Sequence, residues 1–168
     1  FVHPTENKNI FTSPINVKSQ ILKCIEQEIV NHEAGKPSGI WLKCNGLSDK
    51  DIIDALYQAS QKGVICELIV RGICTLIPGI KKLSHNIKVR SVVGRFLEHS
   101  RLYCFANGAP MFSPQNIVYI ASADLMSRNL DYRIEVMAQM KNPTVIMHLT
   151  KEVFAHYMMD NVNAWEMD

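Results

Sequence analysis

The stretch GRFLEHSRLYCF, residues 94–105, places His99 two residues before Arg101 at the start of an apolar run. Arginine keeps its charge and offers a planar fork of donors that suits phosphate oxygens, whereas histidine exchanges a proton near neutral pH. If this run is a strand, its alternation puts both side chains on the same face. The pair could then hold a phosphate while a proton or a phosphoryl group moves. The alternative interpretation is a half-buried ion pair beside a hydrogen-bonded histidine.

Two further segments place polar side chains directly after apolar runs. The run LIVRGIC carries Arg71 followed by Gly72, a residue that lets a ligand approach the backbone closely. The run IASADLMSRNLD combines a hydroxyl, a carboxylate, a guanidinium and an amide, on Ser122, Asp124, Arg128 and Asn129. Such donors bind phosphate oxygens, and a carboxylate orients a basic side chain. A strand end with a solvated arginine, and a turn followed by a helix cap, are the structural alternatives.

Hydrophobic spacing predicts the elements that must position these residues. A first helix is expected from Ser13 as cap and Pro14 as first helical residue, ending at Gly35 and Pro37. A second helix is expected within 47–63, with a capping box formed by Ser48 and Asp51 and a stop at Gly63. A last amphipathic helix opens at Asn142 and Pro143. Strands are predicted within residues 39–45, 64–72, 86–93, 101–105, 116–122 and 132–140.

A strand, a helix and a strand of this length indicate a parallel β-α-β unit. The predicted class is therefore α/β, with a mixed β-sheet flanked by α-helices. Ligands of such sheets lie beyond the carboxyl ends of the strands, which is where Arg71 and the cluster from Ser122 to Asn129 are expected. We predict the functional site at that edge of the sheet.

Composition narrows the protein classes. The 168 residues fit one domain with a sizeable core, and a net charge of +2 disfavours a nucleic-acid binder with a broad basic face. No apolar run is long enough to cross a membrane. The five cysteines lack C-x-x-C spacing and four lie in apolar segments, so we expect reduced, mostly buried thiols in a cytoplasmic protein. Because the chain begins with Phe1, we expect a fragment of a longer polypeptide.

Three stretches together resemble one family. ALYQASQKGVICELIVRGICTLIPG, SVVGRFLEHSRLYCF and SADLMSRNLDYRIEV are similar, in this order and spacing, to the last domain of the long-chain, ATP-dependent polyphosphate kinases. The resemblance covers residues 13–160, and residues 1–12 would be a lead-in from the preceding domain. It implies a phospholipase-D-like fold for a single domain, residues 1–168, forming one half of a two-domain catalytic body.

The resemblance also implies a function. That family reversibly transfers the terminal phosphoryl group of ATP to polyphosphate through a phosphohistidine, which lies in the preceding domain of the same polypeptide. Matched motif by motif, Arg71 and His99 would contact the phosphates of ATP or ADP. His99 would act as proton donor or partner to the phosphohistidine. Supporting roles around the pocket would fall to Arg101, Ser122, Asp124 and Asn129.

Further expectations follow from the same resemblance. Mg²⁺ would serve the full enzyme through ligands outside this chain, and the full enzyme would be a cytoplasmic homo-oligomer, with peripheral attachment to the inner membrane as a variant. The isolated chain is expected to be inactive because the phosphorylated histidine is missing. Four departures from the family pattern put affinity or chain-length preference in question: Ile77, Leu125, Ser127 and Tyr132.

Two other functions remain open on the sequence. One is a phospholipase-D-like phosphodiesterase that pairs two half-sites as a homodimer. Against it, that class carries a lysine and an aspartate where this chain has Arg101 and Ala106. The other is a noncatalytic phosphate-binding module.

Overall fold

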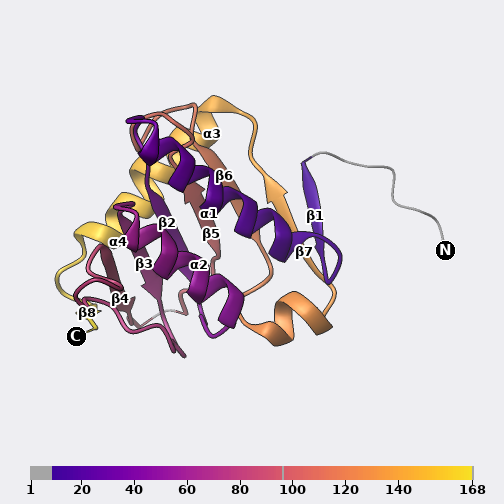
Figure 1. Cartoon of the computed structure of the whole chain (residues 1–168). Helices are drawn as coiled ribbons and strands as arrows, with labels where there is room; N and C mark the ends of the chain where they lie inside the picture. The colour runs from indigo at the N-terminus through magenta and orange to yellow at the C-terminus, as the bar shows by residue number, and fades with distance from the viewer. Residues whose placement is uncertain (1–8, 96, 168) are drawn as a thin grey trace.

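A computed structural model describes residues 9–95 and 97–167 of the chain. In this part of the chain one mixed sheet has the strand order β1-β7-β6-β5-β2-β3-β4-β8. The predicted α/β class with a mixed sheet is therefore confirmed (Figure 1). The strands are β1 Ile10–Ser13, β2 Ile40–Cys44, β3 Cys66–Val70, β4 Ile87–Val92, β5 Leu102–Phe105, β6 Ile117–Ala121, β7 Glu135–Gln139 and β8 Ala164–Glu166.

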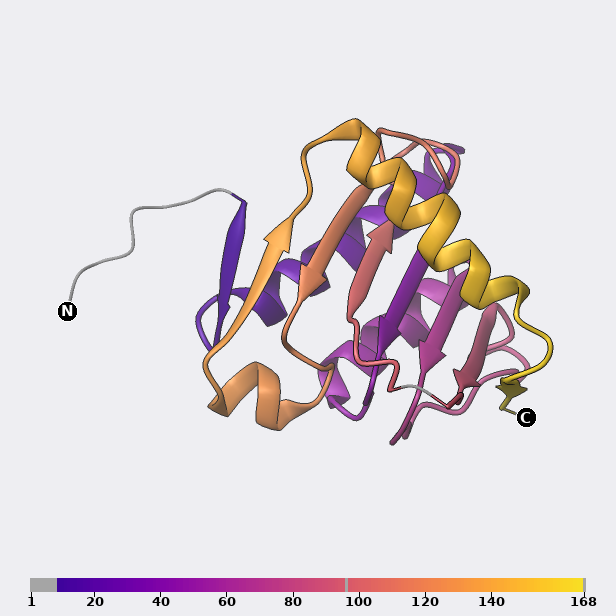
Figure 2. The same cartoon turned by 180° about the vertical axis from the view of Figure 1, so that it is seen from behind.

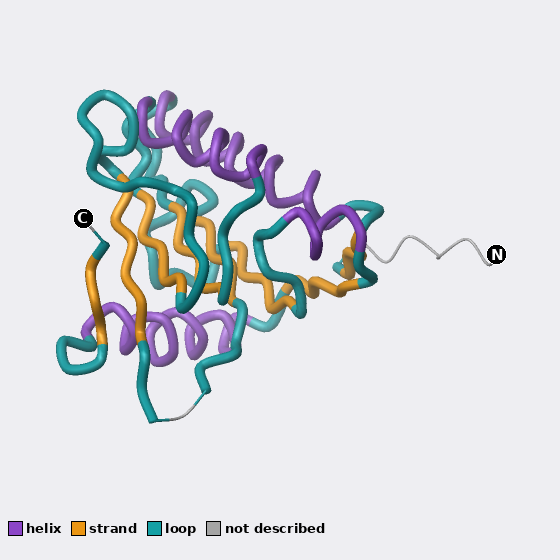
Figure 3. The backbone as a smooth tube through the Cα atoms, turned by 90° about the horizontal axis from the view of Figure 1, so that it is seen from below, coloured by secondary structure: helices purple, strands orange, loops and turns teal. Residues whose placement is uncertain are grey.

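Helices cover both faces of the sheet. Helix α1 (Val17–Glu33) and helix α2 (Lys50–Gln61) lie on one face (Figure 1). Figure 2 shows the other face, which is crossed by a continuous helical rod drawn in yellow. This rod consists of α3 (Pro143–Met147), the π-helical η2 (His148–Phe154) and α4 (Ala155–Met159). Figure 3 shows the resulting three layers edge-on.

The predicted start of the first helix is wrong by one turn. Ser13 is the last residue of β1, and Pro14 lies in a turn in which Ile15 and Asn16 donate backbone hydrogen bonds to the carbonyl of Thr12. Helix α1 then begins at Val17. The strand before it escaped prediction because its four residues pair only with β7, at the far end of the chain. Residues 1–8 of the predicted lead-in lie outside the described residues, whereas residues 10–12 belong to this edge strand.

The predicted capping box of the second helix is also wrong. Asp49, not Ser48, caps α2, because its Oδ1 accepts a hydrogen bond from the backbone N–H of Ile52 at 3.2 Å. Its Oδ2 accepts from Lys18 Nζ and from Ser127 Oγ, both at 3.0 Å. Asp49 thus ties α1 and α2 to the segment that follows β6. The predicted stop at Gly63 is confirmed, with a φ of +100° that only glycine adopts without strain.

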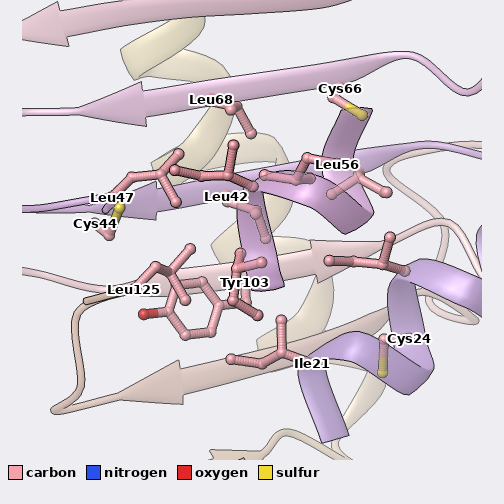
Figure 4. Packing of buried hydrophobic residues seen from close by; sticks show 14 of the residues in the cluster. Ile21, Cys24, Leu42, Cys44, Leu47, Leu56, Cys66, Leu68, Tyr103 and Leu125 are labelled. Carbon is pink, nitrogen blue, oxygen red and sulfur yellow. The ribbon is translucent and has the colours of Figure 1, made fainter. Parts of the chain in front are cut away.

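Two apolar clusters hold the layers together. The larger one fills the space between the sheet and helices α1 and α2, and Figure 4 shows Leu42, Leu68 and Tyr103 meeting Ile21 and Leu56 there. The smaller one lies under the helical rod, where Phe154 stacks on Trp41 with ring centroids 5.3 Å apart. Four of the five cysteines are buried with free thiols, as predicted: Cys24, Cys44, Cys66 and Cys104.

Strand direction defines the edge where a ligand is expected. Strands β2, β3 and β4 are mutually parallel, and β5 is antiparallel to both β2 and β6, so β6 runs with β2. The predicted parallel β-α-β unit is confirmed in β2-α2-β3. The carboxyl ends of β2, β3 and β6 therefore meet the starts of β5 and β7 at one edge. Among the described residues no helix has the length and apolarity needed to cross a bilayer.

Candidate functional site

A pocket of about 560 Å³ lies at this edge of the sheet. All six predicted site residues line it, so the fold brings together three sequence segments as expected. Arg71 follows β3, His99 and Arg101 precede β5, and the others follow β6. The lining residues are Asn45, Arg71, Gly72, Ile73, His99, Arg101, Ser122, Asp124, Met126, Arg128, Asn129, Arg133 and Glu135.

Arg101 and Asp124 form a buried ion pair at the floor of the pocket. Arg101 Nε donates to Asp124 Oδ1 at 3.1 Å and Nη2 donates to Oδ2 at 2.9 Å, and both side chains are about nine-tenths buried. Burial alone would raise the pKa of the Asp124 carboxyl, but hydrogen bonds from Arg101 and from Asn45 lower that pKa below its ordinary value. Asp124 therefore remains a carboxylate that fixes the orientation of Arg101.

Arg101 in turn touches His99. Its Nη1 lies 3.0 Å from His99 Nδ1, and its Nη2 lies 3.3 Å from Nε2. The lone-pair directions of the two ring nitrogens diverge, so one planar guanidinium that reaches both must lie against the face of the ring. The two side chains meet as predicted, but not by strand alternation. Strand β5 begins only at Leu102, and both residues lie in the segment before it.

Three other arginines contribute charge that no carboxylate neutralises. Arg71, Arg128 and Arg133 line the pocket, and none has an ion-pair partner among the residues that the structure describes. Arg71 Nη1 donates only to the carbonyl of Glu98, at 3.3 Å. Four arginines face two lining carboxylates, Asp124 and Glu135, so the pocket carries an excess of positive charge. Such a pocket attracts anions with several oxygens.

Ser122 and Asn129 both donate hydrogen bonds to Glu135. Ser122 Oγ donates to Glu135 Oε2, and Asn129 Nδ2 donates to Glu135 Oε1 at 2.8 Å. The two residues thus brace the start of β7 against the π-helical segment η1 (Arg128–Tyr132), and Glu135 is a site residue that the sequence interpretation missed. Glu135 lies early in the predicted strand 132–140, near the edge where a ligand was expected, and this position could have identified it.

Asn45 is a second missed residue. Its backbone N–H donates to Asp124 Oδ1 at 2.7 Å and its Nδ2 donates to the same oxygen at 3.2 Å. It follows β2 just as Arg71 follows β3, so the rule on carboxyl ends of strands could have found it. The side-chain oxygens of Asn45 and Asn129 are buried and lack a hydrogen-bond partner among the described residues.

The four departures from the family pattern lie outside the pocket lining. Leu125 is fully buried in the larger core cluster, and Ser127 binds Asp49. Ile77 and Tyr132 are exposed, by 57% and 83% respectively, and neither lines the pocket. The side chains at these four positions therefore do not change the charge around Arg71 and His99 by direct contact.

The pocket does not fit a magnesium ion held by this domain alone. Among the described residues no group of three or more His, Cys, Asp or Glu could hold a metal ion. The carboxylate of Asp124 is engaged by Arg101, and that of Glu135 by Ser122 and Asn129. The remaining arginines oppose a cation, and Mg²⁺ needs oxygen ligands that are free to bind it.

Comparison with known proteins shows the family of this chain. Residues 10–168 match the family described as polyphosphate kinase C-terminal domain 2. The polyphosphate kinase of Erythrobacter litoralis is 48% identical over 99% of this chain and 23% of its own length. The polyphosphate kinase of Dictyostelium discoideum is 47% identical over 95% of this chain and 14% of its own length. This chain therefore spans a quarter or less of these relatives.

Solved structures give the same answer for the fold. The crystal structure of polyphosphate kinase from Porphyromonas gingivalis superposes with a TM-score of 0.89 and 40% identity, covering 95% of this chain and 24% of that one. Nuc, a phospholipase D family member from Salmonella typhimurium, superposes with a TM-score of 0.59 at 14% identity, over 94% of this chain and 95% of that one. The latter likeness shows the phospholipase-D-like fold alone. From the match over residues 10–168 and these identities, the chain belongs to the polyphosphate kinase C-terminal domain 2 family.

Proposed function

We propose that this chain forms one half of the phosphoryl-transfer site of an ATP-dependent polyphosphate kinase. The observation that carries the proposal is a pocket in which Arg71, Arg128 and Arg133 have no carboxylate partner within residues 9–95 and 97–167 and lie beside exposed His99. Phosphoryl transfer requires positive charge and donors around the equatorial oxygens more than covalent chemistry. A domain that supplies this charge and no nucleophile suits the complementary half of such a site.

Each site residue then has a distinct part. Arg71 binds oxygens of the phosphates of ATP, ADP or polyphosphate. His99, held against Arg101, donates a proton or a hydrogen bond to the bridging oxygen, or stabilises a phosphohistidine on the facing domain. Arg101 and Asp124 set the orientation of the ring, and Ser122 and Asn129 hold Glu135 and the start of β7.

The rest of the enzyme is part of the same proposal. The preceding domain of the same polypeptide would supply the phosphorylated histidine and any ligands to Mg²⁺, and the assembled enzyme would be a cytoplasmic homo-oligomer. Support for these points is the family membership together with the share of each relative that this chain spans. It follows that the 168-residue chain alone makes no polyphosphate from ATP.

An NMR titration of the histidine ring signals tests the half-site directly. The chain is titrated with ATP, with tripolyphosphate and with a simple phosphodiester, and the His99 signal is assigned from His99→Gln. We expect His99 to respond to ATP and tripolyphosphate in the starting chain and to lose that response in Arg71→Ala. Lys88→Ala removes the same charge from an exposed position of β4 outside the pocket, and it should keep the response.

Two outcomes would contradict the proposal. A response of His99 to the phosphodiester alone would favour a phosphodiesterase that pairs two half-sites. Equal loss of the response in Lys88→Ala would mean that general charge, and not the pocket, attracts the phosphate.

A further inference from the structure

Three successive backbone carbonyls before β5 each accept a hydrogen bond from a different basic side chain. Arg71 Nη1 donates to the carbonyl of Glu98 at 3.3 Å, and Arg101 Nη1 donates to that of His99 at 2.9 Å. Lys43 Nζ donates to the carbonyl of Ser100 at 3.0 Å. The segment has no helix or strand of its own, so these side chains determine where its backbone lies. Arg71 and Arg101 line the pocket, but Lys43 does not.

Lys43 is an unusual strand residue because its side chain is only 2% exposed. It projects from β2 on the face covered by the helical rod, where it meets Tyr157 of α4, and so lies opposite to Leu42 and Cys44, which belong to the larger cluster. Its Nζ also donates to Ser100 Oγ at 2.9 Å and lies 4.7 Å from the centroid of the Tyr157 ring. Burial lowers the pKa of Lys43, and the nearby Glu98 partly opposes that effect. A buried ammonium needs partners for its three donors, and here two hydrogen bonds reach Ser100 while the face of the Tyr157 ring lies close by.

Tyr157 connects the same segment to the end of the helical rod. Its ring packs under Lys43, and its hydroxyl donates to the carboxylate of Glu98. Burial, followed by the bond to Glu98, raises the pKa of Tyr157 to about 12, so the hydroxyl stays a donor at neutral pH. Lys43, Glu98, Ser100 and Tyr157 therefore form one connected group, which we call the Lys43 clamp. The clamp holds Glu98 and Ser100, the two residues on either side of His99.

We propose that Lys43 is a positioning residue for His99, acting through the carbonyl of Ser100 and, by way of Tyr157, through Glu98. This inference rests on the proposed function, because it assigns the clamp a purpose at the same site. Without the clamp, Arg71 and Arg101 still hold the carbonyls of Glu98 and His99, but the carbonyl of Ser100 and the side chain of Glu98 lose their anchors. A displacement of about 1 Å in a reacting group costs about 100-fold in rate, so a clamp of this kind has a measurable effect.

Backbone NMR relaxation of the 168-residue chain separates positioning from mere packing. We expect ordered amides at Glu98, His99 and Ser100 in the starting chain, with order parameters of about 0.85, and values of about 0.6 or lower in Lys43→Met. Tyr157→Phe keeps the ring under Lys43 and removes only the hydroxyl, and we expect an intermediate loss of order. The affinity for tripolyphosphate should fall about tenfold in Lys43→Met, because Arg71 is tethered to the same segment.

Val118→Ala is the matched control. Val118 is fully buried in the same apolar cluster under the rod, and none of the described hydrogen bonds joins it to the Lys43 clamp. Truncation to alanine removes buried methyl groups and destabilises the domain by about 1–2 kcal/mol, while it leaves every hydrogen bond of the clamp in place. Order at residues 98–100 should therefore be unchanged in Val118→Ala. If Lys43→Met does not fold, Ser100→Ala and Tyr157→Phe carry the test.

The outcomes distinguish this inference from the proposed function. Unchanged order at residues 98–100 in Lys43→Met and Tyr157→Phe would overturn the positioning role, whatever happens to binding. Equal loss of order in Val118→Ala would overturn it as well. If tripolyphosphate fails to bind the starting chain, the proposed function fails, while the relaxation data still decide whether the clamp positions His99.

Discussion

The backbone N–H of Gly72 donates to the carbonyl of Asn45 at 3.0 Å, and a Cβ atom on Gly72 would lie 2.8 Å from that same oxygen. The contact joins the carboxyl ends of β2 and β3 inside the pocket, one residue after Arg71. The sequence interpretation assigned Gly72 to the close approach of a ligand. The structure shows instead that the end of the neighbouring strand approaches Gly72 closely. That approach leaves no room for a side chain at position 72.

Gly72→Ala should therefore disturb the site as well as the fold. The two strand ends must separate by a few tenths of an ångström, and we expect the free energy of unfolding to fall by about 1–3 kcal/mol. The affinity for tripolyphosphate should fall with it, because Arg71 moves with the backbone. Gly94→Ala is the control, since a Cβ there meets nothing within 4 Å. Urea unfolding measures the stability of both variants, and calorimetric titration measures their affinity for tripolyphosphate. Equal stability and equal affinity in Gly72→Ala and Gly94→Ala would contradict this prediction.

The ion pair between Arg101 and Asp124 predicts a pH dependence of stability. The folded pKa of Asp124 is depressed, so its contribution is fully present above the ordinary value of about 3.9 and is lost as the pH falls through the folded pKa. Asp124→Asn leaves Arg101 buried without a charge partner, and we expect a loss of about 3 kcal/mol at pH 7.

Urea unfolding at a series of pH values measures this difference. The gap between the starting chain and Asp124→Asn should narrow progressively below pH 4. Asp54→Asn breaks an exposed pair with Lys50 and should leave stability nearly unchanged at any pH. A gap for Asp124→Asn that is constant with pH would show that the amide loses shape complementarity and not charge.

His99 and Arg71 should be essential in the full-length kinase. We expect His99→Ala and Arg71→Ala each to lower turnover of ATP to polyphosphate by at least about 100-fold, as removal of a single transition-state donor does elsewhere. Neither should change the midpoint of thermal unfolding by more than a few degrees, because His99 is exposed and Arg71 makes one long hydrogen bond. Near-normal turnover in both variants would reject the assignment of the site.

Restoring the family residues should have little effect on phosphate binding. Ile77→Arg and Tyr132→Arg each add a charge at an exposed position outside the pocket lining. Because exposed charges are screened over about 10 Å at 0.1 M salt, we expect the affinity for tripolyphosphate to change less than about threefold. A large gain from either substitution would show that bound polyphosphate extends beyond the pocket, over that residue.

The sequence predicted the central strands and the site better than the edges. Apolar runs predicted β2 to β7, and polar residues beside such runs predicted six residues that line the pocket. Strands β1 and β8 were missed because IFTS and AWE are short and owe their structure to pairing with β7 and β4. Their pairing depends on tertiary context, which local patterns do not contain.

Lys43 and Asn45 illustrate the same difficulty within the site. Strand alternation predicts that Lys43 is a polar residue on an open face. In the structure Lys43 is buried, and its Nζ lies over the ring of Tyr157 from α4. Asn45 acquires its role from the carboxylate of Asp124, which follows a different strand. Both contacts join segments far apart in the chain, so local spacing could place Asn45 at the ligand edge but could not reveal the partner of either residue.

The pairing of β1 with β7 has a consequence for synthesis on the ribosome. The strand that emerges early finds its partner only after nearly all of the described chain has been translated, at about 5–20 residues per second. Strands β2 and β3 can meet around α2 long before that, whereas β1 waits for seconds as an unpaired strand. The carboxyl-terminal residues after β6 also complete the pocket. Nascent chains of this domain therefore complete the lining of the pocket and pair β1 with β7 in the same late step.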